Sequence, residues 1–170
     1  MGEKMVLIHT ALLCEAQAFI EYYKLEPVLK KQVYKNEKIV LIVSGIGKEN
    51  IFKIDLAFNT YRVTKAFNIG IAGCNDTNVP IASLHSATHK IEKLPLKTVD
   101  TPQIINDENT TTMYDMEGKY FIEVANKYLK DENIYIFKVI SDHLDDTIQK
   151  KDTIKNMIQK NIKKMDEYIR

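Results

Sequence analysis

The chain has 170 residues, and its 24 lysine and arginine residues nearly balance 23 aspartate and glutamate residues, giving a formal net charge of +1. This length suits one domain, 1–170, that buries its own core without disulfides or structural metals. The scattered, balanced charges argue against partners such as nucleic acid or an anionic membrane surface, and no stretch is long and apolar enough to span a bilayer. We therefore expect a small-molecule ligand.

The first part of the chain predicts a strand, a helix and a hairpin. "MVLIHT" (5–10) is a short apolar run typical of a buried strand, and "EAQAFIEYYKL" (15–25) has apolar residues at helical intervals. Residues 4–18 also have the outline of a signal peptide, but His9 and Thr10 interrupt the apolar run, so a first strand is favoured. "KQVYKNEKIVLIVSG" (31–45) divides at its polar tip into two β-rich runs, which predicts a hairpin.

The middle of the chain predicts a second helix and two strands, followed by a long loop. "GKENIFKIDLAFNTY" (47–61) has a broadly apolar helical face, and "KAFNIGIAGC" (65–74) is expected to form a strand. "PIASLHSATHKI" (80–91) is interpreted as another strand, and the polar segment 92–111 as a loop. Long loops of this kind in compact domains are usually functional or disordered.

The last part of the chain predicts a helix from about Asp115 to Lys130, a strand "NIYIFKVI" (133–140), an acidic turn "SDHLDD" (141–146) and a lysine-rich terminal helix. Strands and helices thus alternate along the chain. This alternation predicts an α/β fold with three layers, in which helices cover both faces of a central mixed, largely parallel sheet.

Cys14 and Cys74 are too few for a disulfide framework, and both lie in apolar or glycine-rich surroundings. We expect two reduced, packed thiols and a cytoplasmic protein. A nucleophilic role for Cys14 is disfavoured because no histidine is adjacent in sequence. His85 and His89 lack a third ligand nearby, so zinc is not expected, and the sequence calls for no metal or cofactor.

Three carboxylates follow or flank predicted strand ends, where ligands bind in open α/β sheets. Glu15 follows the first strand, Asp142 follows the strand 133–140, and Glu117 is near the start of a helix. Glu117 belongs to an apolar helical row with Phe121, so its carboxylate needs a partner, water or a ligand. The plainer interpretations are ordinary helix-start acids for Glu15 and Glu117, and a cap or a divalent-cation cluster with Asp145 and Asp146 for Asp142.

The segment "GIGK" (45–48) is similar to a phosphate-binding loop but departs from that motif. Ile42 is present where the first glycine belongs, and Glu49 follows the lysine where serine or threonine is required. We interpret the segment as a strand-to-helix turn, although Lys48 at a helix start could hold a phosphate.

Five segments together resemble the nucleoside phosphorylase superfamily, in particular its methylthioadenosine/S-adenosylhomocysteine nucleosidases. They occur in the family's order and span most of the chain: "TALLCEA" (10–16), "SGIGKEN" (44–50), "NIGIAGC" (68–74), "YDMEGKYF" (114–121) and "VISDHLDD" (139–146). The resemblance implies an enzyme that cleaves the N-glycosidic bond of a purine nucleoside through an oxocarbenium-like transition state, without a cofactor. It also implies a homo-oligomer, commonly a homodimer.

The resemblance assigns roles to particular residues. Glu15 matches the residue that activates the attacking water, and Asp142, after Ser141, matches the acid that protonates the leaving purine. The pair Met116 and Glu117 matches the residues that grip the ribose, with the glutamate accepting hydrogen bonds from the sugar hydroxyls. A further backbone segment matches one that lies against the base; it contains Gly70, Ala72 and Gly73.

Two departures from the family pattern keep alternatives open. Ile71 replaces a common serine, and the stretch between Gly73 and Asp115 is short and lacks the segment that usually supplies a ring stacking on the purine. A shortened, non-catalytic nucleoside-binding protein is therefore one alternative, and a phosphorylase is another. Hydrolysis is favoured over phosphorolysis, because the only two arginines, Arg62 and Arg170, are far from the expected strand-end loops.

Overall fold

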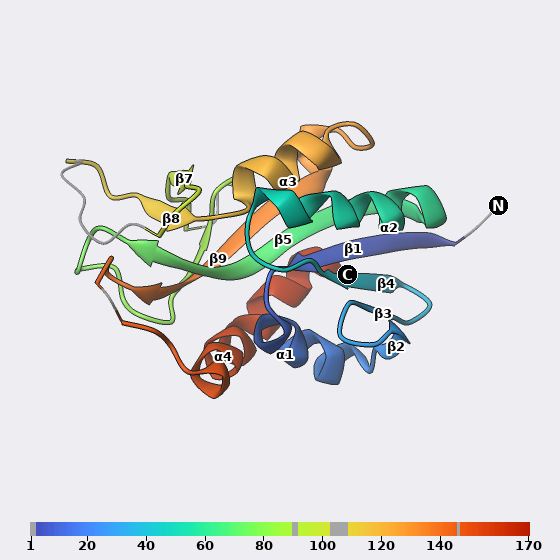
Figure 1. Cartoon of the computed structure of the whole chain (residues 1–170), viewed down its shortest axis with the longest axis horizontal. Helices are drawn as coiled ribbons and strands as arrows, with labels where there is room; N and C mark the ends of the chain where they lie inside the picture. The colour runs from blue at the N-terminus through green and yellow to red at the C-terminus, as the bar shows by residue number, and fades with distance from the viewer. Residues whose placement is uncertain (1–2, 90–91, 103–108, 146) are drawn as a thin grey trace.

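The computed structural model describes residues 3–89, 92–102, 109–145 and 147–170. Its centre is a mixed nine-stranded sheet that runs through the molecule between two layers of helices (Figure 1). The four innermost strands are parallel to one another in the order β4-β1-β5-β9, so their carboxyl ends share one edge region. They are β1 (Lys4–Thr10), β4 (Ile39–Val43), β5 (Arg62–Cys74) and β9 (Ile134–Asp142).

Shorter strands extend this parallel centre on both sides. The predicted hairpin forms from β3 (Val33–Lys35) and β4, and β2 (Glu26–Leu29) adds an antiparallel edge to it. On the other side β6 (Leu84–Ser86) is antiparallel to β9. The strand β8 (Met113–Asp115) is antiparallel to the end of β5 and parallel to β7 (Leu96–Thr98).

Helices cover both faces of the sheet, as the alternating sequence predicts (Figure 1). One layer consists of α1 and α4, and the opposite layer of η1, α2 and α3, while the single turn η2 precedes β9. Their bounds are α1 (Leu13–Tyr23), η1 (Lys48–Ile54), α2 (Asp55–Thr60), α3 (Gly118–Ala125), η2 (Asp131–Asn133) and α4 (Lys151–Ile169). The expected three-layer α/β fold is confirmed.

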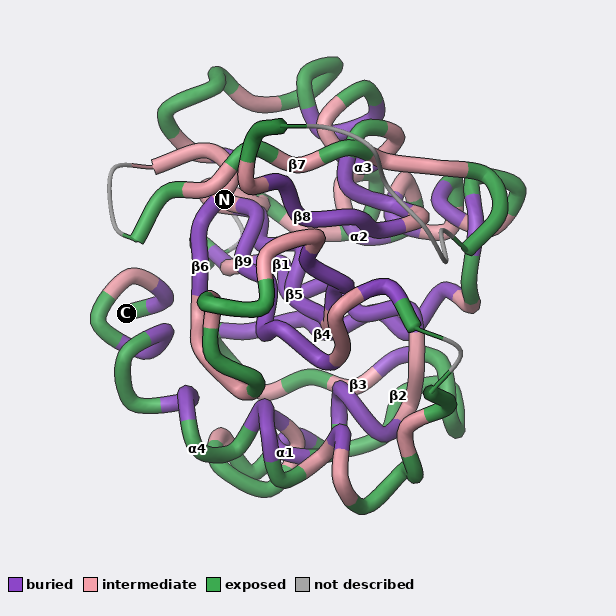
Figure 2. Tube along the Cα trace, turned by 90° about the vertical axis from the view of Figure 1, so that its left-hand side faces the viewer, coloured by how far each residue is buried: buried purple, intermediate pink, exposed green. Residues whose placement is uncertain are grey.

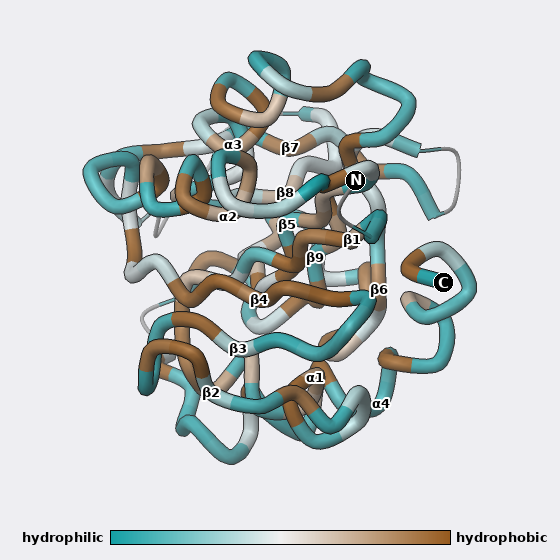
Figure 3. Tube along the Cα trace, turned by 90° about the vertical axis from the view of Figure 1, so that its right-hand side faces the viewer, coloured by the Kyte–Doolittle hydropathy of each residue, from teal (hydrophilic) through white to brown (hydrophobic). Residues whose placement is uncertain are grey.

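The apolar character of the central strands has a direct structural cause. Successive side chains of a strand point to opposite faces, and here each face has its own core: Leu7 packs with η1, α2 and α3, whereas Ile8 packs with α1 and α4. The central strands are accordingly buried along their length (Figure 2) and mostly apolar (Figure 3). A sheet covered on both faces needs continuous apolar runs rather than alternating ones.

Several sequence predictions differ from the structure in extent. The helix expected from Asp115 to Lys130 spans only Gly118–Ala125, because Asp115 belongs to β8 and residues 126–129 form turns. Within the described residues 80–89 of the expected strand 80–91, only Leu84–Ser86 form a strand, and residues 90–91 lie outside the described part. The segment 92–111, expected to be a loop, contains β7; residues 103–108 of it lie outside the described part.

Both cysteines are buried and form no disulfide with each other, as expected. Within the described ranges, none of the helices combines the length and apolar character that crossing a membrane requires.

Candidate functional site

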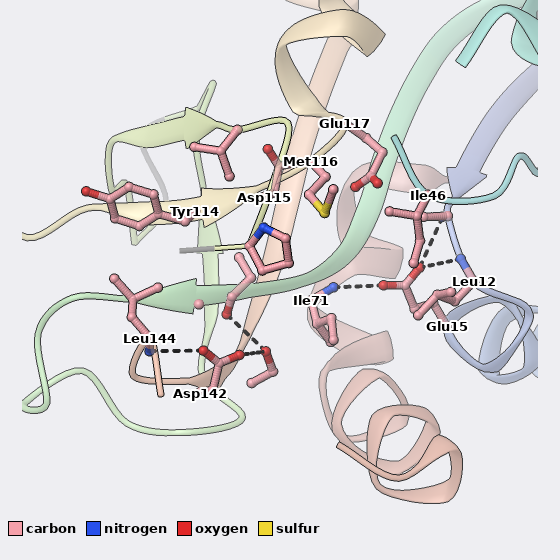
Figure 4. Close-up of a pocket in the computed structure, with 16 residues that line it drawn as sticks. Leu12, Glu15, Ile46, Ile71, Tyr114, Asp115, Met116, Glu117, Asp142 and Leu144 are labelled. Carbon is pink, nitrogen blue, oxygen red and sulfur yellow. Dashed lines mark hydrogen bonds between the residues drawn. The ribbon is translucent and has the colours of Figure 1, made fainter. Parts of the chain in front are cut away.

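A cavity of about 240 Å³ lies where the carboxyl ends of the parallel strands meet the segment around β8. This volume is slightly below the range of about 300–1,000 Å³ typical of small-molecule sites. The walls come from segments far apart in the sequence: Ala11, Leu12, Glu15, Ile46, Ile71, Ala72, Gly73, Val99, Pro102, Tyr114, Asp115, Met116, Glu117, Ser141, Asp142 and Leu144. Glu15 and Glu117 lie toward one end of this pocket and Asp142 toward the other, with Ile71 between them (Figure 4).

Glu15 is in the first turn of α1, and it is only 3% exposed rather than an exposed helix-start acid. One carboxylate oxygen accepts hydrogen bonds from the backbone N–H groups of Ala11 (3.1 Å) and Leu12 (2.9 Å), and the other from that of Ile71 (3.0 Å). Burial raises the pKa of Glu15 to about 7, although the Leu12 and Ile71 N–H groups oppose this shift. Glu15 is thus close to the pKa that suits a general base at neutral pH.

Glu117 is the residue that precedes α3, and its side chain does not cap that helix. Its carboxylate instead accepts a hydrogen bond from the backbone N–H of Gly47 at 2.9 Å. The side chain is buried, and burial raises the pKa of Glu117 despite the opposing attraction of Lys138 and of the Gly47 N–H. A buried carboxylate with few fixed donors, directed into a cavity, can accept hydrogen bonds from a ligand's hydroxyl groups.

Asp142 reaches the cavity through an irregularity at the end of β9. Ala72 pairs with Ile140 but Gly73 pairs with Asp142, so Ser141 is an extra residue at this point, as in a β-bulge beside an active site. The Asp142 carboxylate accepts hydrogen bonds from the Ser141 hydroxyl (2.6 Å) and from the Leu144 N–H (3.0 Å). The bulge therefore places both Ser141 and Asp142 at the cavity wall.

The strand β5 forms the floor of the site, and its glycines make room for two of the carboxylates. A Cβ at Gly70 would lie 2.8 Å from Glu15 Oε1, and a Cβ at Gly73 would lie 2.8 Å from Asp142 Oδ1. Ala72 and Gly73 line the cavity, whereas Gly70 lies beneath Glu15 and is outside the lining set. Met116 lines the cavity next to Glu117.

A buried ion pair lies beside these carboxylates, and the sequence alone did not predict it. Lys138 Nζ lies 2.8 Å from Asp115 Oδ2, and both side chains are at most 2% exposed. Burial disfavours the charged form of Lys138, but Asp115, Glu117 and Glu15 outweigh this effect and raise the pKa of the ammonium group. The signal was a lysine inside the apolar strand run "IYIFKVI", since a buried charge requires a partner.

Other expectations about the site have mixed outcomes. The segment after β7, expected to be a polar loop, contributes Val99 and Pro102 to the cavity wall. Arg62 begins β5 at the strand end remote from Gly73, and Arg170 pairs with Asp166, so neither arginine lines the cavity. No cluster of potential metal-binding side chains occurs among the residues that the structure describes; Asp146, part of the alternative cation cluster, lies outside them.

No protein-family model matches the sequence, and no curated protein sequence is significantly similar to it. Solved structures do match in fold. A 5′-methylthioadenosine/S-adenosylhomocysteine nucleosidase of Helicobacter pylori, complexed with a pyrrolidine-based compound, aligns over 99% of this chain and 100% of its own with a TM-score of 0.75 and 17% identity. This chain therefore shares the fold of that nucleosidase.

Two further structures support the same fold. A methylthioadenosine nucleosidase variant of Chlamydia trachomatis, bound to methylthioadenosine, aligns over all of both chains with a TM-score of 0.77 and 17% identity. The futalosine hydrolase of Helicobacter pylori aligns over 98% of each chain with a TM-score of 0.73 and 17% identity. The predicted resemblance in fold to nucleosidases is thus confirmed, at an identity too low to transfer a substrate.

Proposed function

We propose that this chain, which folds like the nucleosidases, is itself a nucleosidase-like hydrolase that cleaves the N-glycosidic bond of a purine nucleoside. The observation that carries the proposal is that Glu15, Glu117 and Asp142, which are far apart in sequence, line one cavity. Paired acids in different environments are how a site holds a base and an acid at the same pH. The substrates expected are nucleosides of the methylthioadenosine and adenosylhomocysteine type.

The proposed mechanism assigns one task to each carboxylate. Glu117 accepts hydrogen bonds from the ribose hydroxyls, and the ionised form of Glu15 takes a proton from the attacking water. Asp142 is the acid assigned to donate a proton to the purine as the bond to the sugar breaks. The sugar passes through an oxocarbenium-like transition state, whose positive charge the buried carboxylates stabilise.

Water is favoured over phosphate as the acceptor because no arginine lines the cavity. Lys138, the buried cation nearest these carboxylates, is already paired with Asp115. The proposal requires no cofactor and no metal, and it includes a cytoplasmic location, a homo-oligomer and a small-molecule nucleoside as partner, with neither nucleic acid nor a membrane.

The direct test is to incubate the pure protein with adenosine, inosine and methylthioadenosine, with and without phosphate, and to assay the free base. We expect release that does not depend on phosphate; phosphate-dependent release would indicate a phosphorylase. No release from any of the three would refute the hydrolase, and stabilisation by a nucleoside without turnover would identify a non-catalytic binding protein.

Two substitutions separate the roles of the glutamates. Glu15→Ala should keep nucleoside binding but lower kcat by about 10²–10⁴-fold, because it removes only the general base. Glu117→Ala should abolish binding. Glu123→Ala, on the exposed side of α3, is the matched control and should change neither. Full turnover by Glu15→Ala would show that the water-activating role is misassigned.

A further inference from the structure

His9 is a buried titratable residue for which the proposed mechanism has no use. It lies on β1, between β4 and β5, and is 0% exposed. Burial, with a smaller effect of Lys138, lowers the pKa of His9 to about 3, so the imidazole is neutral at physiological pH. A neutral imidazole has one donor and one acceptor nitrogen, and both are engaged here.

The contacts of His9 form a chain with one consistent direction. The amide nitrogen of Asn68 lies 2.8 Å from His9 Nδ1 and donates to it, which places the proton of the ring on Nε2. His9 Nε2 then donates to the Ser44 hydroxyl at 2.7 Å, and that hydroxyl donates to the Gly45 carbonyl at 2.7 Å. These hydrogen bonds join the three side chains into one buried network, in which Asn68 Oδ1 has no hydrogen-bond partner among the described residues.

The network ends in the loop 44–47, which contains the first three residues of the "GIGK" segment, a segment that departs from the phosphate-loop motif. Gly45 and Gly47 have φ values of 95° and 89°, a backbone region that side chains rarely adopt. Additional hydrogen bonds fix this loop: Lys53 Nζ donates to the Ser44 carbonyl at 2.6 Å, and the Asn50 amide donates to the Ile46 carbonyl at 2.9 Å. The loop is thus built around a specific backbone conformation.

That conformation directs the Gly47 N–H at the Glu117 carboxylate. The same imidazole also stacks on Phe121, with ring centroids 5.5 Å apart, and Phe121 is one turn beyond Glu117 on α3. His9 is therefore linked to both partners of the Gly47–Glu117 hydrogen bond. Its hydrogen bond to Ser44 leads to the loop of Gly47, and its stacking on Phe121 leads to the helix that Glu117 precedes.

We propose that His9 is a positioning residue that acts through Ser44 and the loop 44–47 to orient Glu117 toward the sugar hydroxyls of a bound nucleoside. This inference rests on the proposed function for its substrate, but the geometry of the network does not depend on it. The "GIGK" segment then serves as a backbone support for a carboxylate and binds no phosphate.

The variants that test the proposal are His9→Phe, which keeps the ring and the stacking on Phe121 but removes both hydrogen bonds, and Ser44→Ala. His9→Gln should restore function, because its amide can donate near the position of Nε2. His85→Phe is the matched control: His85 is a buried histidine on β6, hydrogen-bonded to Ser83 and the Glu92 carbonyl, outside the cavity wall.

The first measurement is hydrogen exchange of the Gly47 amide, which needs no activity. We expect exchange about tenfold faster in His9→Phe and Ser44→Ala than in wild type and His85→Phe, because the loop loses its support. Unchanged Gly47 exchange in both variants would overturn the proposal. If His9→Phe fails to fold, the exchange of the Gly47 amide in Ser44→Ala alone tests the proposal.

The second measurement compares kcat and KM for adenosine and 2′-deoxyadenosine. We expect KM for adenosine to rise about tenfold in His9→Phe with a smaller change for the deoxynucleoside, because the deoxynucleoside has one hydroxyl fewer that can bond to Glu117. Equal losses for both substrates would indicate a purely structural role and refute the proposal. A wild type without turnover would refute the proposed function, while Gly47 exchange would still decide the role of His9.

Discussion

At the scale of single residues, the site is a set of buried carboxylates around one buried cation. Glu15, Glu117 and Asp115 all interact electrostatically with Lys138, so one positive charge serves three acids. Burial is the largest cause that raises the pKa values of Glu15 and Glu117, and repulsion between the acids adds to it: Glu117 raises the pKa of Glu15, and Asp115 raises that of Glu117. This arrangement leaves Glu15 able to exchange a proton near neutral pH.

The raised pKa of Glu15 predicts a pH dependence of both activity and stability. We expect kcat/KM to increase with pH and reach half its plateau near pH 7, because the base acts only when ionised. Stability should change with pH in the opposite direction to kcat/KM. Between its unfolded value of 4.5 and about 7 the folded state binds more protons, so the free energy of unfolding should fall as pH rises through this interval.

Stopped assays and urea titrations at matched pH values measure both effects. Glu15→Ala should lose the pH dependence of stability between pH 5 and 7 that Glu15 causes. An activity profile that is flat from pH 5 to 8 would show that another group supplies the base.

The buried ion pair predicts a large effect of Lys138→Met. The change leaves the Asp115 carboxylate buried without its cation and should lower the free energy of unfolding by about 3–5 kcal/mol. Urea denaturation measures it. Adding Asp115→Asn should recover much of the loss, whereas Lys119→Met, whose side chain is 67% exposed, should cost little. A loss in Lys138→Met as small as that in Lys119→Met would mean that the pair is not coupled.

At the scale of elements, the sequence predicted what depends on long apolar runs and missed what depends on short contacts. The sequence predicted the strands around Ile8, Leu41 and Ile136, because a sheet covered on both faces needs long apolar runs. It also predicted the terminal helix. The strands β2, β7 and β8 have only three or four residues each, and their pairing depends on the rest of the sheet rather than on their own composition. Short strands of this kind give little periodic signal.

The candidate site shows the same division. Glu15, Glu117 and Asp142 were singled out because they flank strand ends and match the motifs of the resembled family, and all three line the cavity. The network of His9, Ser44 and the loop 44–47 could not be found, because its contacts join residues 35 or more positions apart. Lys138 in its apolar strand indicates a buried partner, but the sequence does not show that this partner is Asp115, because the folded sheet brings the two residues together.

One hydroxyl adds to the backbone pairing that attaches β7 to β8. Thr98 Oγ1 donates to Asp115 Oδ1 at 2.6 Å and accepts from the Lys119 N–H at 2.9 Å. Thr98→Val keeps the shape and should lower the free energy of unfolding by about 1–3 kcal/mol, because Asp115 loses a donor. Thermal and urea denaturation measure this. Thr64→Val, whose hydroxyl makes a 3.4 Å contact with the Met5 carbonyl, is the control; equal effects would refute the bridging role of Thr98.

At the scale of the whole molecule, several large apolar side chains are exposed. Ile46 lines the cavity and is 47% exposed, and Phe52 and Leu56, four residues apart on η1 and α2, are 61% and 53% exposed. Exposed apolar surface gathered on one part of a protein is typical of a contact with another protein. It is consistent with the homo-oligomer that the resemblance implies.

A homodimer predicts a mass in solution of twice the 19.6 kDa of one chain, measured by light scattering after size exclusion. Leu56→Lys should shift the mass toward one chain, because it places a charge on the apolar surface. Val28→Lys, equally exposed at 55% but on the edge strand β2, should leave the mass unchanged. A monomeric wild type would remove the prediction.

The two glycines of β5 have one more consequence. Gly70 supports Glu15 and Gly73 supports Asp142, and both lie on a single continuous strand three residues apart. A strand rises about 3.3 Å per residue, so its backbone holds the two supports roughly 10 Å apart. That interval is set by a central strand that is paired on both sides, so movement of the surrounding loops changes access to the acids but leaves the spacing of their two supports intact.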